Sequence, residues 1–311
     1  MTGICGTDHK ILAGRLAVAG EGTILGHEGV GTVVEVGGSV TRLRVGDRVI
    51  INPTQSCGSC RNCRLGAFCY CFDFDDHQVG FSLAGTFAEY FVTKARYLYP
   101  IPEGMSWQVA SLVEPLGCSL NSVVKSNPRP QESVLVIGSG AIGLLCQSIA
   151  RRLSRLTVAT EPNAFRREFA AGIAHYALHP DELTPQTVAD LTGGKKFDVV
   201  IDAVGDQLGT ALAVVAKGGR VVPMGYDDTY RVEVAPTTLI DDGVSIIAAV
   251  PLHDAIGPAI DLAADLPELA ELVTTDVDLA DYRAAFTQTM GIDVTTGQKV
   301  EVKAVKAVIR S

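Results

Sequence analysis

The segment that most constrains the fold is an apolar run at 134–137 (VLVI), followed directly by a glycine-rich turn at 138–143 (GSGAIG). A short apolar run bounded by polar residues and glycine predicts a strand buried on both faces of a parallel sheet. The turn matches the pattern G-x-G-x-x-G, and an apolar stretch with helical spacing follows at 141–153. A strand, a glycine turn and a helix in this order predict a dinucleotide-binding βαβ unit.

Each position of this turn has a physical role in that interpretation. Gly138 permits the tight turn, Gly140 lets the backbone approach a pyrophosphate, and Gly143 allows the helix to pack closely on the strand. The helix begins at Ala141 and Ile142, where free amide groups and the positive end of the helix dipole attract phosphate. The alternative of ordinary turn glycines is disfavoured by the strand before them and the helix after them.

The choice between NAD and NADP depends on the end of the next strand. The expected acidic residue lies about 20 residues beyond the turn, and Glu161 occupies that place. Its carboxylate would accept hydrogen bonds from the ribose hydroxyls and would repel a 2′-phosphate. The sequence therefore favours NAD over NADP, although the nearby Arg166 could soften that preference.

The alternation of strands and helices continues and predicts a doubly wound α/β domain. The sequence before this domain instead predicts short strands interrupted by glycine. This pattern is typical of a small β-barrel-like or sandwich domain. In the α/β domain, strands are expected at 156–159, 198–202 and 220–224 and helices at 166–174 and 208–216. Elsewhere, strands are expected at 30–36, 48–51, 87–92 and 299–309 and helices at 111–124, 255–264 and 279–288.

A cluster of cysteines interrupts the strand-rich region. Cys57, Cys60 and Cys63 follow one another at intervals of three, and Cys71 comes eight residues later. This spacing is typical of four thiolates around one Zn²⁺ with no open coordination position, and such a site is structural. Cys69 could compete with Cys71, but we favour Cys71. Iron–sulfur ligation is the rival interpretation, although the Pro that follows the fourth Cys of ferredoxin-type runs is missing.

Composition excludes several classes of function. Lys and Arg number 26 against 35 Asp and Glu, a net charge of −9 that disfavours binding to nucleic acid or to anionic membranes. The longest weakly polar stretch is well short of the ~20 apolar residues that a membrane span needs. The N-terminus, MTGICGTDHK, lacks the pattern of a signal peptide, so we expect a cytoplasmic protein with reduced cysteines.

Several short motifs occur along the chain: GICGTD at 3–8, GHE at 26–28, GDRV at 46–49, the four-Cys cluster, GTFAEY at 85–90, EP at 114–115 and the glycine-rich turn. In this order they resemble the zinc-dependent medium-chain alcohol dehydrogenases over essentially the whole chain. Glu114, where many members have Cys, is similar to the polyol, sugar and threonine dehydrogenase branch. The resemblance implies a GroES-like β-barrel catalytic domain and a Rossmann domain.

The resemblance also implies a second, catalytic zinc. Cys5 and His27 would be ligands, and Glu28 would be a ligand or an exchangeable neighbour of the metal. Glu114 would be the remaining protein ligand or a carboxylate that holds the metal-bound water. A catalytic Zn²⁺ has about three protein ligands and an open position for water or substrate oxygen, which agrees with this set.

The implied reaction is hydride transfer from a secondary alcohol to NAD. Zinc lowers the pKa of the alcohol, and the proton leaves through a hydroxyl relay in which Thr7 occupies the family position. Asp8 would orient the loop of ligands. Many members end the relay at a His five residues after the Cys, where this chain has Lys10 with His9 adjacent. Either of these two could form the solvent end of the relay.

The resemblance further predicts how the chain divides. The catalytic domain would comprise 1–112 and 253–311, and the NAD-binding domain 113–252. Family members carry a few dozen residues before the Cys5 motif, so we expect the opening strands to be missing and a sheet edge to be exposed. Family members also associate, and a homodimer or homotetramer pairing through 244–250 is expected by analogy.

Three hypotheses follow. The first is a zinc- and NAD-dependent dehydrogenase of a small-molecule secondary alcohol, such as a polyol, sugar, aminocyclitol or hydroxy amino acid. The second is a truncated remnant that binds NAD and zinc without turnover. The third, a zinc-free quinone or enoyl reductase, is disfavoured by the four-Cys cluster together with Cys5 and His27.

Overall fold

The protein divides into two compact units, each described here by itself. The computed structural model describes residues 1–249, 252 and 255–311. The first unit comprises Met1–Gly117 and Leu252–Ser311, and the second comprises Cys118–Pro251. The helix α4 (Val113–Ser126) contains the boundary between them. Among the described residues, no helix has the length and apolar character needed to cross a membrane.

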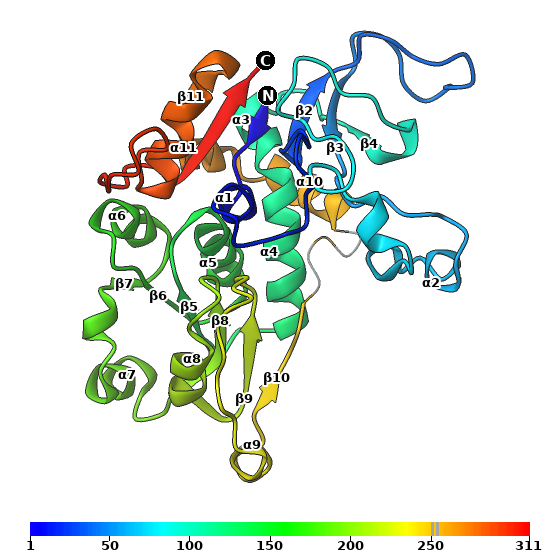
Figure 1. Cartoon of the computed structure of the whole chain (residues 1–311). Helices are drawn as coiled ribbons and strands as arrows, with labels where there is room; N and C mark the ends of the chain where they lie inside the picture. Colours follow the sequence, from blue (N-terminus) through cyan, green and yellow to red (C-terminus); the bar gives the residue numbers. More distant parts are fainter. Residues whose placement is uncertain (250–251, 253–254) are drawn as a thin grey trace. The chain divides into compact units, whose positions relative to one another are not determined.

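The second unit is built on a six-stranded sheet in the order β10-β9-β8-β5-β6-β7, and every strand pair in it is parallel. Helices surround these strands (Figure 1). Its strands are β5 (Ser133–Ile137), β6 (Leu156–Thr160), β7 (Tyr176–Leu178), β8 (Phe197–Asp202), β9 (Val215–Pro223) and β10 (Ser245–Ile246). Its helices are α5 (Ala141–Leu153), α6 (Ala164–Ile173), η4 (Pro180–Glu182), α7 (Pro185–Thr192), α8 (Leu208–Val214) and α9 (Pro236–Asp242).

The core of this unit forms where the sequence is most apolar. All five residues of β5 are buried, and Leu135 belongs to one apolar cluster with Val158 of β6, Val200 of β8 and Val221 of β9. A strand covered on both faces has no polar side to present, which explains the uninterrupted apolar run. The predicted doubly wound architecture is confirmed for this unit.

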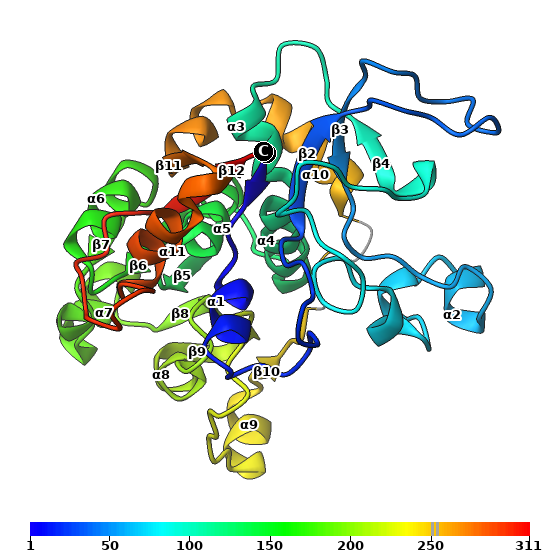
Figure 2. The same cartoon turned by 45° about the horizontal axis from the view of Figure 1, so that its top comes forward.

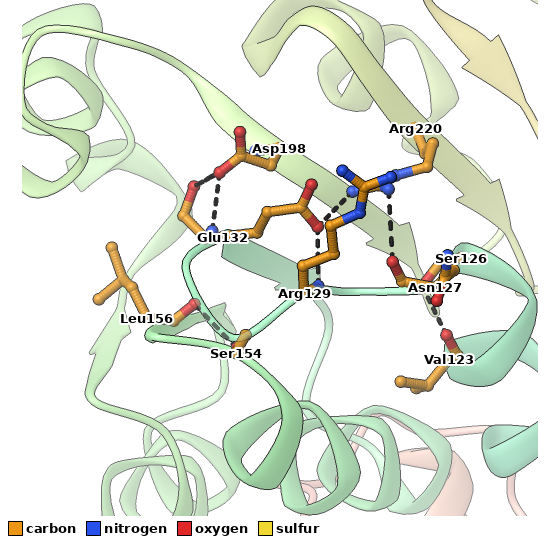
Figure 3. Close-up of polar contacts among 10 residues, drawn as sticks. Val123, Ser126, Asn127, Arg129, Glu132, Ser154, Leu156, Asp198 and Arg220 are labelled. Atoms are coloured by element: carbon orange, nitrogen blue, oxygen red, sulfur yellow. Dashed lines mark hydrogen bonds and ion pairs between the residues drawn. The ribbon is translucent and has the colours of Figure 1, made fainter.

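Polar contacts tie together the loops that enter this sheet (Figure 3). Glu132, just before β5, forms an ion pair with Arg220 of β9, with 2.5 Å between Oε2 and Nη2. Asp198 of β8 accepts hydrogen bonds from the backbone amide and the hydroxyl of Ser133, at 2.8 and 2.9 Å. These contacts join β5, β8 and β9 at the same end of the sheet.

The first unit contains a second six-stranded sheet, in the order β11-β12-β1-β2-β3-β4. Only the β11–β12 pair among these is parallel, and the two ends of the chain lie side by side because β1 pairs with β12 (Figures 1 and 2). The strands are β1 (Thr2–Gly3), β2 (Glu28–Thr32), β3 (Arg48–Ile51), β4 (Leu98–Pro100), β11 (Val273–Asp278) and β12 (Lys306–Arg310).

Short helices fill the connections of the first unit. The longer ones belong to its C-terminal part, where α11 packs on β11 and β12. The helices are α1 (Gly6–Leu12), α2 (Arg61–Arg64), η1 (Phe68–Tyr70), η2 (Phe74–His77), η3 (Ala95–Tyr97), α3 (Trp107–Ser111), α10 (Ile256–Ala264), η5 (Pro267–Leu272), η6 (Leu279–Asp281) and α11 (Tyr282–Met290).

Two strands predicted in the first unit are wrong or too long. The segment 87–92 forms no strand, because the amide of Phe87 bonds to the loop carbonyl of Leu25 and Val92 is 93% exposed. The strand expected at 30–36 ends at Thr32. Both segments line one open groove of about 840 Å³. Their β-branched and aromatic residues predict strands, but a strand needs a neighbour with which to bond.

Other boundaries also differ. The strand expected at 299–309 begins only at Lys306, since Val300 bonds back to the carbonyl of Gly291 after α11. The helix expected at 208–216 ends at Val214, where the chain enters β9. The segment 244–250 predicted to pair between subunits is described only to residue 249, and within it β10 is an edge strand of its sheet.

Candidate functional site

The loop before α1 places Cys5 beside two side chains of its own turn. The backbone amide of Cys5 donates to Oδ2 of Asp8 at 2.9 Å, which closes the first turn of α1. The Cys5 thiol lies 3.5 Å from the hydroxyl of Thr7. Asp8 is fully buried, and this burial raises the pKa of its carboxyl. The fixed turn therefore presents the thiol and the hydroxyl together.

His27 directly precedes β2 and Glu28 begins it, and both side chains lie close to Cys5. Nδ1 of His27 lies 3.7 Å from Oδ1 of Asp8, and its ring packs on Phe81 with 5.0 Å between ring centroids. Burial alone would lower the pKa of His27, but the negative charges of Asp8 and Cys5 outweigh it and raise that pKa well above its usual value. The site therefore favours positive charge at this position.

The residues Cys5, His27 and Glu28 are suited to bind a metal ion. One possible ligand atom each from Cys5, His27 and Glu28 lies within 4.8 Å of the other two. Among the described residues, His27 Nδ1 and Asp8 Oδ1 are buried without a hydrogen-bond partner. A carboxylate behind one ring nitrogen is how proteins orient a histidine whose other nitrogen binds a metal. Thiolate, imidazole and carboxylate are all zinc ligands.

Glu114 lies near this group but outside it. It is 8% exposed at the start of α4, and its negative charge helps raise the pKa of His27. It is not part of the three-residue group whose ligand atoms lie close together. Its predicted role as a ligand or as a carboxylate near the metal stays a prediction.

The two candidates for the end of the proton relay differ in their surroundings. His9 contacts the hydroxyl of Thr289 through Nε2 at 2.9 Å, and its ring meets Phe286 edge-on. Lys10 is half-buried on α1. The position of Thr7 beside Cys5 agrees with the relay role that the resemblance implies, and that role also stays a prediction.

The four-Cys cluster gathers Cys57, Cys60, Cys63 and Cys71, and their sulfurs also lie within 4.8 Å of one another. The sulfur of Cys63 is 3.5 Å from that of Cys60 and 3.9 Å from that of Cys57. Thiolates at ~2.3 Å from a tetrahedral zinc are separated by about 3.8 Å, so these distances fit. Cys69 is buried on η1 and does not belong to the group.

Backbone amides stabilise a negatively charged thiolate in this cluster. Hydrogen bonds from the amides of Ser59 and Cys60 lower the pKa of Cys57 to about 6. Burial raises the pKa of Cys71 to about 11, so the thiols differ in how readily they ionise without a cation. A zinc ion would hold all four as thiolates.

The glycine-rich turn follows β5 in the predicted manner. Gly138 has φ +93°, and a Cβ on Gly143 would lie 2.1 Å from the carbonyl oxygen of Gly138. A Cβ on Gly140 would meet nothing within 4 Å, although Gly140 caps the N-terminus of α5. The N-terminus of α5 thus has open space at Gly140, as a phosphate-binding turn requires.

Glu161 lies directly against this turn. Its carboxylate accepts hydrogen bonds from the amides of Ser139 at 2.7 Å and Asn163 at 2.9 Å. Burial lowers the pKa of Arg166, while the charge of Glu161 opposes that shift. Glu161 thus supports the loop, a role that the sequence did not reveal.

Lys306 is the residue of this region that sequence reasoning missed. It is 3% exposed, donates to the carbonyl of Ile4 at 2.9 Å and forms an ion pair with Glu28. The one signal was a lysine inside an otherwise apolar C-terminal run, AVKAVI. Burial of a charge predicts a partner, but the sequence does not identify it.

Comparison with known proteins identifies the family. The model of the alcohol dehydrogenase GroES-like domain matches residues 1–103, and that of the zinc-binding dehydrogenases matches 141–265. The chain is 31% identical over 258 residues to D-arabinitol dehydrogenase 1 of Uromyces fabae, a match that covers 80% of this chain and 73% of that protein. The chain belongs to the zinc-dependent medium-chain alcohol dehydrogenase family. The expected GroES-like and Rossmann folds are thereby confirmed.

Other relatives act on related compounds. D-xylulose reductase A of Aspergillus oryzae is 33% identical over 72% of this chain and 66% of its own length. Sorbitol dehydrogenase of Bacillus subtilis is 26% identical over 91% of this chain and 82% of its own length. A zinc-binding dehydrogenase from Sinorhizobium meliloti bound to NADP has a TM-score of 0.88 at 25% identity, covering 100% of this chain and 90% of that one.

Proposed function

We propose that this family member oxidises a secondary alcohol of a polyol or sugar with NAD, or reduces the corresponding ketone. The observation that carries the proposal is the close group of Cys5, His27 and Glu28, in which the last two are buried, with Asp8 behind the histidine. Relatives named as arabinitol and sorbitol dehydrogenases and as a xylulose reductase support the substrate class.

Different residues of the first unit would have different roles in this reaction. Cys5, His27 and Glu28 would hold zinc, which supplies a Lewis acid for the substrate hydroxyl when bound. Asp8, whose carboxylate lies 3.7 Å from Nδ1 of His27, would keep the His27 ring oriented. The Thr7 hydroxyl, which lies beside the Cys5 thiol, would accept the proton that the alcohol loses and pass it on.

The second unit would bind the nicotinamide cofactor, which takes up the hydride when bound. The amides at the start of α5 would receive the pyrophosphate, and Gly140 leaves the space for it. The buried carboxylate of Glu161 disfavours a 2′-phosphate nearby, which supports NAD as the cosubstrate. The four-Cys cluster would hold a second, structural zinc.

A substrate panel tests the proposal. The zinc-loaded protein is assayed for NADH and NADPH formation with pentitols, hexitols, aminocyclitols and hydroxy amino acids. We expect the highest kcat/KM with a polyol or sugar alcohol and NAD, and a smaller preference for NAD in Glu161→Ala. Binding of NAD without turnover of any alcohol would favour the remnant hypothesis, and turnover of quinones alone would contradict the zinc mechanism.

A further inference from the structure

Gln147 places a buried amide against the glycine-rich turn of the second unit. It lies in the middle of α5, and 0% of its surface is exposed. Its Nε2 donates a hydrogen bond to the hydroxyl of Ser139 at 2.9 Å and another to the carbonyl oxygen of Gly138 at 3.4 Å. One side chain of the helix thus contacts both residues that begin the turn.

The geometry of α5 brings this side chain to the turn. Gly143 and Gln147 are four residues apart in α5, so they lie on the same face of the helix. A Cβ on Gly143 would lie 2.1 Å from the carbonyl oxygen of Gly138, so only glycine lets the helix approach the turn this closely. The close approach puts that carbonyl within reach of the Gln147 amide.

Ser139 connects the amide of Gln147 to the carboxylate of Glu161. Ser139 is fully buried, its hydroxyl accepts from Gln147, and its backbone amide donates to Oε2 of Glu161 at 2.7 Å. Glu161 follows β6 and also accepts from the backbone amide of Asn163. The residue between Gly138 and Gly140 is therefore held by α5 and by the loop after β6.

The side-chain amide of Gln147 is not fully satisfied. In the part of the chain that the structure describes, its Oε1 is buried and has no hydrogen-bond partner. A buried polar atom without a partner destabilises a fold, whereas apolar groups of similar shape in place of a hydrogen-bonded pair are often neutral or stabilising. Stability alone therefore does not account for a glutamine here, while its contacts with the turn indicate a role in binding.

We propose that Gln147 is a positioning residue that holds the turn at 138–140 in the conformation that receives the pyrophosphate of the cofactor. A turn that is ordered before binding loses less conformational entropy on binding, so the ligand binds more tightly. The pyrophosphate would meet the amides at the start of α5, and Gln147 joins the turn to this same helix. The inference rests on the proposed function, since it concerns the cofactor of that reaction.

The test compares the parent with Gln147→Met, whose side chain has a similar length and no hydrogen-bond donor. Binding of NADH is measured by its fluorescence, and binding of ADP-ribose and of adenosine by competition with NADH. We expect NADH and ADP-ribose to bind about 3–10-fold more weakly to Gln147→Met, which corresponds to the loss of about one hydrogen bond. Adenosine lacks the pyrophosphate, so its affinity should stay that of the parent.

Urea unfolding separates positioning from damage to the fold. Because Gln147→Met also removes the unpartnered Oε1, its free energy of unfolding should equal or exceed that of the parent. Ser148→Ala is the matched control, because the Ser148 hydroxyl lies on the same helix and donates to the carbonyl of Leu144 and not to the turn. This control should leave the affinity for all three ligands unchanged.

Two results with Gln147→Met would overturn the inference. The first is an NADH affinity equal to that of the parent. The second is an equal loss of affinity for NADH, ADP-ribose and adenosine together with a lower free energy of unfolding, because general damage to the unit has that effect.

Ser139→Ala tests the same contact from the other side, also in the case that Gln147→Met does not fold. It removes the hydroxyl that accepts from Gln147 and should also weaken NADH binding. Where both variants fold, the double variant should bind NADH no more weakly than Gln147→Met alone, because the two changes break the same hydrogen bond. Unchanged NADH binding in Ser139→Ala, or additive losses in the double variant, would contradict the inference.

The binding measurements need neither zinc nor an alcohol, so they distinguish the two proposals. A parent that oxidises a polyol with NAD, combined with unchanged NADH affinity in Gln147→Met, contradicts the inference alone. A parent that does not bind NADH contradicts the cofactor of the proposed function, and the inference falls with it.

Discussion

At the scale of the residue, Asp8 joins the two parts of the proposed catalytic site. Its carboxylate accepts from the amide of Cys5 and faces His27. Asp8→Asn keeps an oxygen for the amide of Cys5 and removes the charge behind the histidine. We expect zinc affinity at this site to fall by about 10–100-fold, the range for outer-shell partners, as measured by competition with a chelator.

The chain offers a matched control for this substitution. Asp47 also accepts from the amide three residues before it, that of Arg44, at 2.9 Å, but it faces no metal-site residue in the described contacts. Asp47→Asn should leave zinc affinity unchanged. Equal affinity in Asp8→Asn and the parent would contradict the role of Asp8.

His175 gives a prediction about pH. Partial burial and the charge of Arg151 lower its pKa below 6.5, and its Nδ1 accepts a 2.9 Å hydrogen bond from the amide of Thr157. A protonated ring cannot accept this bond. The neutral ring therefore stabilises the fold fully above pH 6.5, and this contribution is lost as pH falls through the lowered pKa.

Urea unfolding at several pH values measures this contribution. We expect the free energy of unfolding to decrease between pH 7 and pH 5, and to decrease less in His175→Gln. The same pH dependence in both proteins would show that His175 does not cause it.

Which site residues the sequence predicts depends on whether they belong to motifs. Cys5, His27 and Glu28 stand in short motifs whose order is recognisable, and the structure brings them together. Lys306 was missed because its partner Glu28 lies 278 positions away. No local pattern encodes an ion pair between segments so distant in the chain.

At the scale of the element, the ion pair of Glu132 and Arg220 connects the loop before β5 with β9 (Figure 3). The two side chains are 15% and 16% exposed, so Arg220→Met leaves a largely buried carboxylate without its cation. We expect a loss of about 1–3 kcal/mol in the free energy of unfolding. Adding Glu132→Gln should recover part of this loss, because the unpaired charge is then removed.

An exposed pair in the same unit provides the comparison. Lys217 and Asp242 form an ion pair at 3.0 Å, with 81% of the lysine side chain exposed. Lys217→Met should cost only about 0–1 kcal/mol, since solvent screens such pairs. Similar losses for the two substitutions in urea unfolding would contradict the importance of burial.

We expect the segment of the four-Cys cluster to stay folded only with its metal bound. Its helix α2 has four residues, and Leu65 and Phe72 around it are 68% and 71% exposed, so little apolar packing holds it. After chelation, trypsin should cleave at the exposed Arg61 and Arg64 much faster than in the zinc-loaded protein. Equal cleavage rates with and without metal would contradict a structural zinc here.

Elements that depend on their own stretch of sequence were predicted well. Elements that depend on a partner distant in the sequence were not. The bounds of α5 are as expected, because its apolar period and its glycine cap lie in one stretch of sequence. The segment 87–92 has the composition of a strand but forms none. Composition predicts the tendency of a strand to form, while its formation depends on a partner that the sequence does not identify.

At the scale of the whole molecule, one unit is continuous in sequence and the other is assembled from both ends of the chain. The pairing of β1 with β12 brings Gly3 next to Val308, and through it Lys306 reaches the loop of Cys5. The proposed catalytic site therefore depends on contacts between the first and last residues. This dependence explains why its motifs are separated in the sequence while the dinucleotide turn is compact.

The most direct test of the central claim measures bound zinc and NADH formation in the same samples of the parent and of Cys5→Ser. The account predicts two zinc ions per chain and polyol-dependent NADH formation for the parent. For Cys5→Ser it predicts one zinc ion, retained by the four-Cys cluster, and no NADH formation. A parent that carries two zinc ions and oxidises none of the alcohols, or a Cys5→Ser variant that keeps its activity, would contradict the account.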